Sequence, residues 1–430
     1  MFSSRIWACR RYFIFTGLLL YTAGVPYTAM ANDAYSIADS ALHPGDVANA
    51  VPRLGFELHG NAFFIDNEHS GSSRVNGYTI PGVSLQPRLT WRLDRRVSLQ
   101  TGVHWLHFWG NNSPYDKEGV DLLCTAIDST QPAMLQPWVQ LRLDPADWVT
   151  LVLGNLINTD GHRLPLPLYN PERTVAAEPE AGVQILLKRP WLLADVWVDW
   201  QQFIWNNSPR RERFIAGVSA EASVKTGDWR LYAPMYLLAQ HLGGEDRSDT
   251  THSVQTYYNA AAGLGVSRQL GTVKLRADCS AMFFYRDGDK EGSLNYVNAD
   301  GWVYLSGPPL NFKRGWGVYP RLTAEWGNLW AEATFWSGEK FIPLLGCYHY
   351  SNVSVNTSDM THDRIRVAAL RMQWTPDKMR YCTMHIYGAY YHYFPFTADR
   401  TSYSKVEGKA ADIFSVGVTV EFNFAVPLLQ

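Results

Sequence analysis

The chain has 430 residues, a formal net charge of −2 and only 18% charged residues. A nearly neutral chain has no global field that attracts nucleic acid or an anionic surface, so we expect no nucleic-acid partner. The length suits two ordinary domains or one large one, and 14% aromatic residues suit an aromatic-rich β-protein.

The N-terminus has the pattern of a secretory leader. Arg5, Arg10 and Arg11 form a positive region, an apolar stretch covers Tyr12–Tyr21, and Ala29-Met30-Ala31 is a small-x-small cleavage site. The predicted boundaries are therefore a signal peptide over residues 1–31, a polar periplasmic segment over 32–51 and the main domain over 52–430. No later stretch approaches the roughly 18–20 apolar residues of a spanning helix.

After the leader, short segments of alternating apolar and polar residues recur about sixteen times. In Val83–Asp94, for example, Val83, Leu85 and Leu89 share one face, while polar side chains take the other. Successive side chains of a strand point to opposite faces, so each segment predicts a strand with one apolar side. The predicted strands are Phe56–Phe64, Val83–Leu93, Val97–Trp109, Leu135–Leu143, Val149–Ile157, Ala181–Lys188, Leu192–Phe203, Phe214–Val224, Trp229–Gln240, Thr256–Ser267, Val273–Tyr285, Trp316–Trp326, Leu329–Trp336, Arg364–Trp374, Met379–Phe394 and Asp412–Phe424.

The connections between these strands alternate in length. Seven tight turns, such as Thr226-Gly227-Asp228 and Gly327-Asn328, join even strands to the next odd ones, and the other connections are mostly long. Pro87, Pro137, Pro234 and Pro320 fall inside predicted strands, where proline removes a ladder donor. They should mark bulges or the ends of hydrogen-bonded regions.

The final strand, Phe414–Phe424, places Phe414, Val416 and Val418 on one apolar face and ends in an aromatic residue. Together with the turn pattern and the leader, it resembles the bacterial outer-membrane β-barrel class, and most closely the sixteen-stranded porins. The strand departs from the class by the six residues that follow Phe424. The resemblance implies an all-β antiparallel transmembrane barrel with short periplasmic turns and long extracellular loops, located in the bacterial outer membrane and inserted by the barrel-assembly machinery.

Charged residues of both signs alternate with the apolar faces. A charge facing lipid costs about 2–4 kcal/mol at the midplane for Arg or Lys, so these side chains should face the interior. As pore-lining residues we assign Glu57, Arg88, Arg92, Arg142, Glu221, Lys274, Arg276, Arg321, Glu325, Arg371 and Glu421. The same mixture of signs would also suit a salt-bridge network in a closed barrel.

The third long loop, Asn158–Pro179, is rich in leucine and proline. Porins fold the loop at this position into the barrel, so the resemblance implies a pore constriction here. Its candidate residues are Arg163, Glu172, Arg173, Glu178 and Glu180. An apolar loop packed on other loops at the cell surface remains the alternative.

Enzyme signatures are missing: we find no nucleophile elbow, no Gly-rich phosphate loop and no two-Cys metal pair. The acidic stretch that starts at Asp287 has partial calcium-loop spacing, but a solvated turn explains it better. Cys124 and Cys347 either pair or stay free thiols.

The sequence therefore predicts a passive channel for small hydrophilic solutes, with no enzymatic activity, no metal and no cofactor. Its partners would be the lipid bilayer and the solutes, and the architecture permits a homo-oligomer. The alternative is a closed or plugged barrel that acts as a structural or surface-binding protein through its long loops, and a barrel enzyme is a third hypothesis.

Overall fold

The computed structural model describes residues 54–69, 75, 77–109, 133–203, 212–243, 254–287, 295–296, 303–304, 312–353, 360–377, 379, 381–400 and 405–429. All of them belong to one compact unit, residues 34–430. The predicted leader, the segment 32–51, Cys124 and most of the acidic stretch after Asp287 lie outside the described residues.

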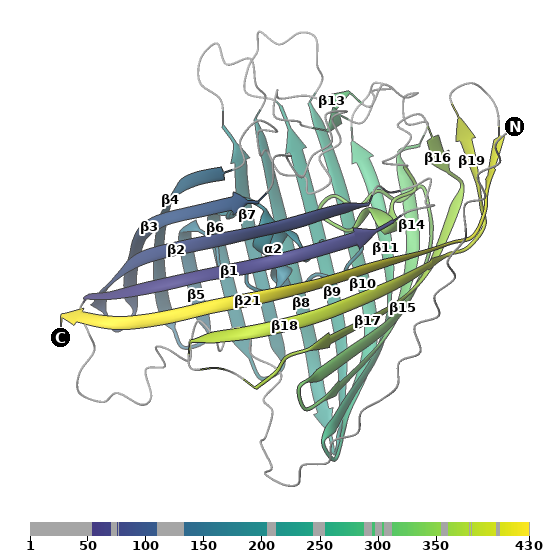
Figure 1. The fold of residues 1–430 in the computed structure, drawn as a ribbon. Helices are drawn as coiled ribbons and strands as arrows, with labels where there is room; N and C mark the ends of the chain where they lie inside the picture. The colour runs from purple at the N-terminus through teal and green to yellow at the C-terminus, as the bar shows by residue number, and fades with distance from the viewer. Residues whose placement is uncertain are drawn as a thin grey trace, which may run out of the picture. The chain divides into compact units, whose positions relative to one another are not determined.

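Sixteen antiparallel strands form a closed barrel, and β1 pairs with β21 to complete it (Figure 1). The barrel strands are β1 (Leu54–Glu68), β2 (Tyr78–Asp94), β3 (Val97–Phe108), β4 (Ala133–Ala146), β5 (Val149–Asn155), β6 (Ala181–Arg189), β7 (Leu192–Gln202), β8 (Arg213–Thr226), β9 (Trp229–Leu242), β10 (Gln255–Leu270), β11 (Val273–Asp287), β14 (Arg314–Trp326), β15 (Leu329–Glu339), β17 (Arg364–Trp374), β18 (Cys382–Tyr393) and β21 (Ala411–Leu429). All sixteen predicted strands are present, and the predicted fold class is confirmed.

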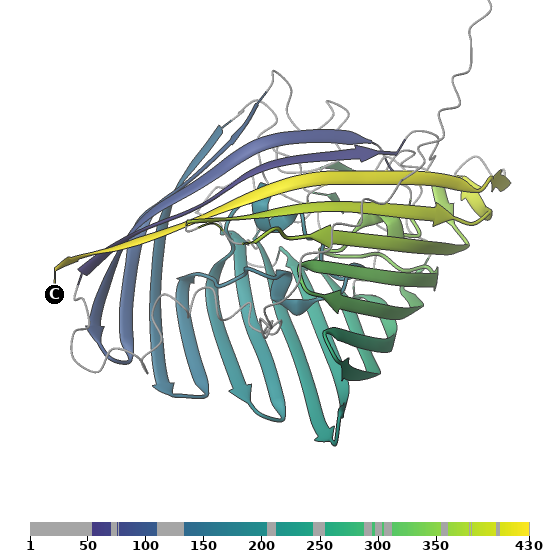
Figure 2. The same cartoon turned by 60° about the horizontal axis from the view of Figure 1, so that its bottom comes forward.

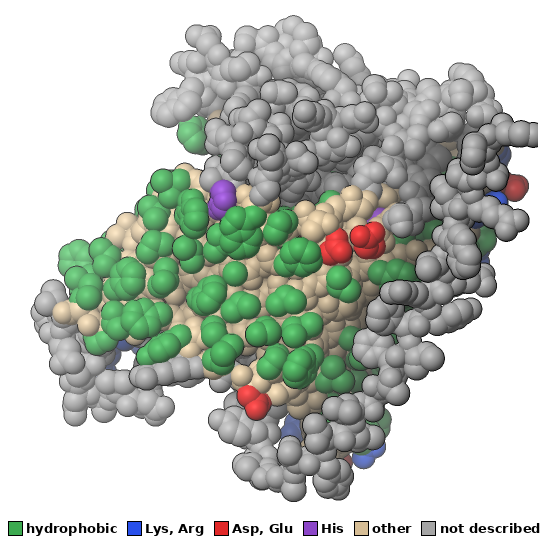
Figure 3. Space-filling view, viewed as in Figure 1, with side chains coloured by type: hydrophobic (Ala, Val, Ile, Leu, Met, Phe, Trp, Pro, Cys, Tyr) green, Lys and Arg blue, Asp and Glu red, His purple; other side chains and the backbone are tan. Residues whose placement is uncertain are grey.

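The alternation of side chains decides which face meets lipid. In β21, Ile413 and Ser415 are buried inside, whereas Phe414 and Val416 are about half exposed on the outer face. Burying such apolar side chains in hydrocarbon is favourable, and closure leaves no unpaired sheet edge in the membrane. Figure 3 shows that most of the coloured side chains on this outer face, over β1, β2, β18 and β21, are hydrophobic.

The strand prolines lie where pairing with one neighbour is interrupted. The pairing of β2 with β3 breaks between Leu85 and Arg88, around Pro87. The pairing of β14 with β15 breaks between Val318 and Arg321, around Pro320. A proline has no backbone N–H to donate, so each gap accommodates it while the ladder on the other side continues.

The tight turns gather at one end of the barrel, here called the turn end; the opposite end is the loop end. Gly227, Gly271 and Gly327 have φ of +60°, +58° and +55°, a left-handed conformation that glycine adopts without steric cost. Two sheets lie outside the barrel order: β12 (Asn295–Tyr296) with β13 (Val303–Tyr304), and β16 (Met360–His362) with β19 (Phe396–Arg400) and β20 (Lys405–Gly408).

Two segments fold into the barrel interior, residues 156–180 and 340–353, and together they are called the plug. The first carries η1 (Gly161–Arg163) and α2 (Arg173–Ala176), and the second carries η2 (Tyr348–Tyr350). Figures 1 and 2 show α2 inside the ring of strands. None of the described helices is long and apolar enough to cross a membrane.

The two plug segments hold each other through backbone contacts. Tyr169 and Leu345 form a parallel bridge, and the Asn170 N–H donates to the Leu345 carbonyl at 2.7 Å. Leu168, Phe341 and Tyr350 are fully buried in the main hydrophobic core. The core of this protein therefore lies inside the barrel, built from plug and wall side chains.

Candidate functional site

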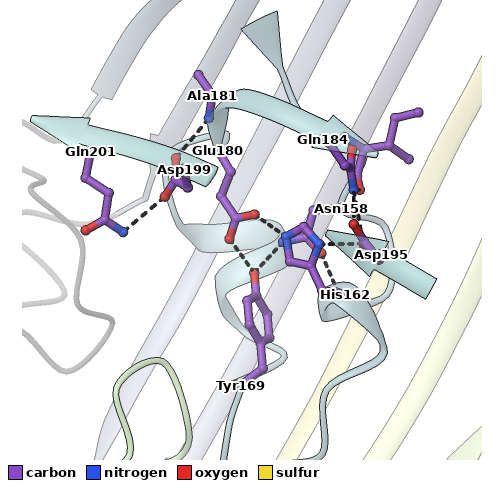
Figure 4. Close-up of polar contacts among 10 residues, drawn as sticks. Asn158, His162, Tyr169, Glu180, Ala181, Gln184, Asp195, Asp199 and Gln201 are labelled. Atoms are coloured by element: carbon purple, nitrogen blue, oxygen red, sulfur yellow. Dashed lines mark hydrogen bonds and ion pairs between the residues drawn. The ribbon is translucent and has the colours of Figure 1, made fainter. Parts of the chain in front are cut away.

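His162 anchors the first plug segment to the barrel wall (Figure 4). Its Nδ1 lies 2.8 Å from Asp195 of β7, and its Nε2 lies 2.5 Å from Glu180. The ring also stacks on Trp197, with centroids 3.8 Å apart and planes 3° apart. Each ring nitrogen faces a carboxylate, and the side chain is fully buried. We therefore assign His162 as a protonated imidazolium that forms two ion pairs inside the barrel.

The electrostatics agree with that assignment. Burial lowers the pKa of His162, but Glu180 and Asp195 raise it more, to about 10. Burial raises the pKa of Glu180, but the His162 charge outweighs it and leaves that pKa below its usual value. His162 and Arg163 hold left-handed backbone, φ +52° and +59°, which costs roughly 1 kcal/mol or more for each. The ion pairs offset this strain.

The predicted constriction residues all belong to the first plug segment, but they contact protein groups. Glu172 accepts hydrogen bonds from Asn67 at 2.9 Å and Tyr78 at 2.5 Å. Arg173 is buried with its guanidinium over the Tyr169 ring. Arg163 lies 3.9 Å from Glu221, Glu180 binds His162, and Glu178 is half-buried.

The predicted lining residues point into the barrel, where they form ion pairs and short networks. Arg230 and Arg276 both contact Glu221, while Arg321 bridges Asp278 and Glu332. The other assignments contact as follows: Glu57 with His59 and Thr90, Arg88 with the Trp138 ring, Arg142 with Asp144, Lys274 with Glu325, Arg371 with Glu332, and Glu421 with His385. Arg92 is partly buried on the same inner face. The geometry is that of a neutralising network.

A cavity of about 290 Å³ lies beside α2, against β1, β17, β18 and β21. Its lining includes Glu172, His349 and Arg371, but these groups already bind protein partners: His349 Nδ1 lies 2.5 Å from the Tyr393 hydroxyl, and Arg371 pairs with Glu332. The imidazole–carboxylate pair of the cavity lining is His385 with Glu421, 3.6 Å apart and toward the turn end.

A second polar group lies on the outer face of the barrel, at the loop end. Strands β18 and β21 pair His392 with Asp412. His392 Nδ1 lies 2.7 Å from Asp412 Oδ1, and the Tyr390 hydroxyl donates to the same oxygen at 2.7 Å. The His392 side chain is 33% exposed and that of Asp412 is 55% exposed. This is the arrangement in which a carboxylate orients an imidazole and leaves Nε2 to exchange a proton.

Side chains of β15 and β17 border this dyad. The Phe394 ring meets His392 edge-on at 4.7 Å between centroids and also packs against Phe335. Ala368 lies opposite His392 in the neighbouring strand and contributes only a methyl group there. Within the described ranges no group of His, Cys, Asp and Glu is arranged to hold a metal ion.

Comparison with known proteins decides the family. The family model described as "Lipid A 3'-O-deacylase-type" matches residues 47–428. The chain belongs to this family. None of the curated proteins compared matches the chain.

Solved structures give a weaker likeness. The BenF-like porin of Pseudomonas fluorescens Pf-5 is 10% identical over 88% of this chain and 100% of its own, with a TM-score of 0.48. OpdK of Pseudomonas aeruginosa is 9% identical over 87% of this chain and 99% of its own, with a TM-score of 0.45. OmpT of Vibrio cholerae is 9% identical over 86% of this chain and 99% of its own, with a TM-score of 0.43.

Two sequence-based predictions are wrong. The predicted function as a channel for small hydrophilic solutes and the prediction that the chain is not an enzyme are both overturned by membership in a deacylase family. The porin assignment depended on the strand architecture, the export signal and the final strand, which indicate the fold and the location of a protein and not its chemistry. The localisation as an outer-membrane β-barrel is confirmed.

Sequence reasoning also missed residues. It did not single out His162, the segment 340–353, or the His392–Asp412 pair. The signal for the plug segment was available in its apolar run FIPLL, while the pair depends on a strand register that the sequence does not display.

Proposed function

We propose that this protein hydrolyses an acyl ester of lipid A, with His392 and Asp412 as the catalytic dyad. The observation that carries the proposal is the hydrogen-bonded dyad on the lipid-facing surface of a member of a deacylase family. Lipid A is itself a membrane lipid, so its ester groups meet the outer face of the barrel without entering the plugged interior.

The depth of the dyad supports this assignment. His392 is the last residue but one of β18, and Asp412 is the second residue of β21. Both therefore lie at the loop end, and in outer-membrane barrels that end faces outward while the short turns face the periplasm. At this level the acyl chains of an outer-leaflet lipid join its sugar, so an ester carbonyl can reach the imidazole.

The chemistry uses water as the nucleophile. His392 Nε2 removes a proton from water while the water oxygen adds to the ester carbonyl carbon, and Asp412 stabilises the resulting imidazolium through Nδ1–H. The tetrahedral intermediate then expels the sugar alkoxide, which takes the proton from Nε2. The products are a free fatty acid and a sugar hydroxyl, and the imidazole is regenerated.

The predicted domain boundaries, partner and site residues take the following roles in this proposal. Residues 1–31 act as the export signal, residues 32–51 lie in the periplasm, and the assembly machinery inserts residues 52–430 as the barrel. The substrate partner is lipid A in place of small solutes. In this proposal the constriction residues hold the plug in place, and the lining residues form ion pairs and hydrogen bonds inside the barrel.

A kinetic experiment on the purified protein in lipid A micelles tests the dyad. His392→Gln should lower kcat/KM by about 10²–10⁴-fold, the range expected for loss of a general base. Asp412→Asn should also lower it, because the amide stabilises the imidazolium poorly. His107→Gln is the matched control, since His107 is an outer-face histidine that stacks on Trp105 without a carboxylate among the described residues. Wild-type activity in His392→Gln would exclude this dyad.

A further inference from the structure

One arginine beside the dyad has no acidic partner in the part of the chain that the structure describes. Arg366 lies on the outer face of β17, is exposed, and forms no ion pair with a carboxylate of the described residues. Its neighbour Arg364 differs, because it pairs with Glu339 of β15. A lone guanidinium at the level of lipid headgroups attracts phosphate, which it binds through two parallel hydrogen bonds.

A single aromatic ring, that of Phe394, contacts both Arg366 and His392. The Phe394 N–H donates to the Arg366 carbonyl at 3.2 Å, which aligns the two residues across adjacent strands. The Arg366 guanidinium carbon lies 5.4 Å from the centre of the Phe394 ring, and that ring contacts the His392 imidazole. The cation and the base therefore lie on two sides of one side chain.

We infer that Arg366 binds a phosphate of the lipid substrate and so orients the acylated sugar with an ester carbonyl toward His392. This inference rests on the proposed function. Lipid A joins phosphate and acyl esters on one compact sugar head, so a group that holds the phosphate within one ring's width of the base also positions the ester. Arg366 is thus a specificity-determining residue, and Phe394 is the spacer between the phosphate and the reacting carbonyl.

The charged groups around Arg366 favour an anion over a protein partner. Glu339 is engaged by Arg364, and Asp412 is engaged by His392 and Tyr390. Phe335, Phe394 and Ala368, which are aromatic or small, lie nearby. An anionic head flanked by apolar chains matches such a surface, with the chains lying along the exposed apolar residues of the outer face.

The first arm of the test compares hydrolysis of lipid A that carries its phosphates with hydrolysis of dephosphorylated lipid A. Wild-type protein should prefer the phosphorylated form by about tenfold or more in kcat/KM, as expected for a charge-assisted hydrogen bond. Arg366→Gln should bring the ratio close to one, and Arg366→Lys should keep part of it. Arg314→Gln is the matched control, because Arg314 also lies against a ring, that of Tyr285, but two strands away on β14. Equal loss in both Gln variants would mean a general charge effect and would overturn the specific contact.

The second arm separates this inference from the proposed function. The His392→Gln protein and the His392→Gln, Arg366→Gln double variant are placed in nanodiscs, and retention of intact phosphorylated lipid A is measured by native mass spectrometry. Less retention by the double variant supports the contact even if no variant hydrolyses lipid. Equal retention, together with an unchanged substrate ratio in Arg366→Gln, would show that the phosphate does not bind there.

Discussion

His162 stacks on Trp197 with their ring centroids 3.8 Å apart and their planes 3° apart. This contact joins the first plug segment to strand β7, and the carboxylates of Asp195 and Glu180 complete the attachment. The first plug segment is therefore attached to the barrel wall by an aromatic stack and by a buried, ion-paired histidine. Disturbing the cation should affect the whole barrel.

Replacing His162 by Gln should strongly destabilise the protein. The change leaves two buried carboxylates without their cation, and breaking a buried ion pair in this way costs about 3–5 kcal/mol. Equilibrium unfolding of the detergent-solubilised protein, followed by tryptophan fluorescence, measures the loss. His107→Gln, on the outer face, should behave as wild type. A change below about 0.5 kcal/mol in His162→Gln would refute the anchor.

The same cation predicts a pH dependence of stability. The pKa of His162 is raised from 6.5 to about 10, so its contribution is complete below pH 6.5 and is lost as pH rises through about 10. Wild-type protein should therefore unfold at lower denaturant concentration at alkaline pH, and His162→Gln should lack this component. Parallel pH curves for the two proteins would show that His162 does not titrate in this range.

Asn259 of β10 should hold the second plug segment in place. Its buried amide donates to the Ile342 carbonyl and accepts from the Leu344 N–H, both at 2.9 Å. Asn259→Ala leaves two buried backbone groups without a hydrogen bond, and each such loss lowers the stability by about 1–3 kcal/mol. Hydrogen exchange over residues 340–353 should accelerate while exchange in the barrel strands stays slow. Unchanged protection of that segment would argue that other contacts suffice.

Cys347 should resist alkylation in the folded protein. Burial raises the pKa of its thiol to about 12, so little reactive thiolate forms near neutral pH. Maleimide labelling of Cys347, located by peptide mass spectrometry, should be slow in the native barrel and fast after denaturation. Rapid native labelling would mean that the plug opens readily around Asn170, which the thiol contacts at 3.6 Å.

The strands could be predicted because alternate positions of a strand face either lipid, which favours apolar side chains, or the barrel interior, which accepts polar ones. In β21 this rule alone sorts Phe414 outward and Ser415 inward. The dyad could not be found in the same way. His392 and Asp412 are separated in sequence by the excursion through β19 and β20, and only the register of β18 with β21 brings them together. The apolar loop Asn158–Pro179 lies inside the barrel. Its charged side chains attach it to the wall there, through ion pairs with residues such as Asp195 and Glu221.

Product analysis tests the proposed deacylase activity most directly. Purified protein is incubated with lipid A, and the lipid and any released fatty acid are identified by mass spectrometry, for wild type, His392→Gln and His107→Gln. We predict that wild type and His107→Gln release one fatty acid and leave lipid A with a new hydroxyl at the ester position, while His392→Gln releases almost none. Intact lipid A with folded wild-type protein, or equal release by His392→Gln, would contradict it.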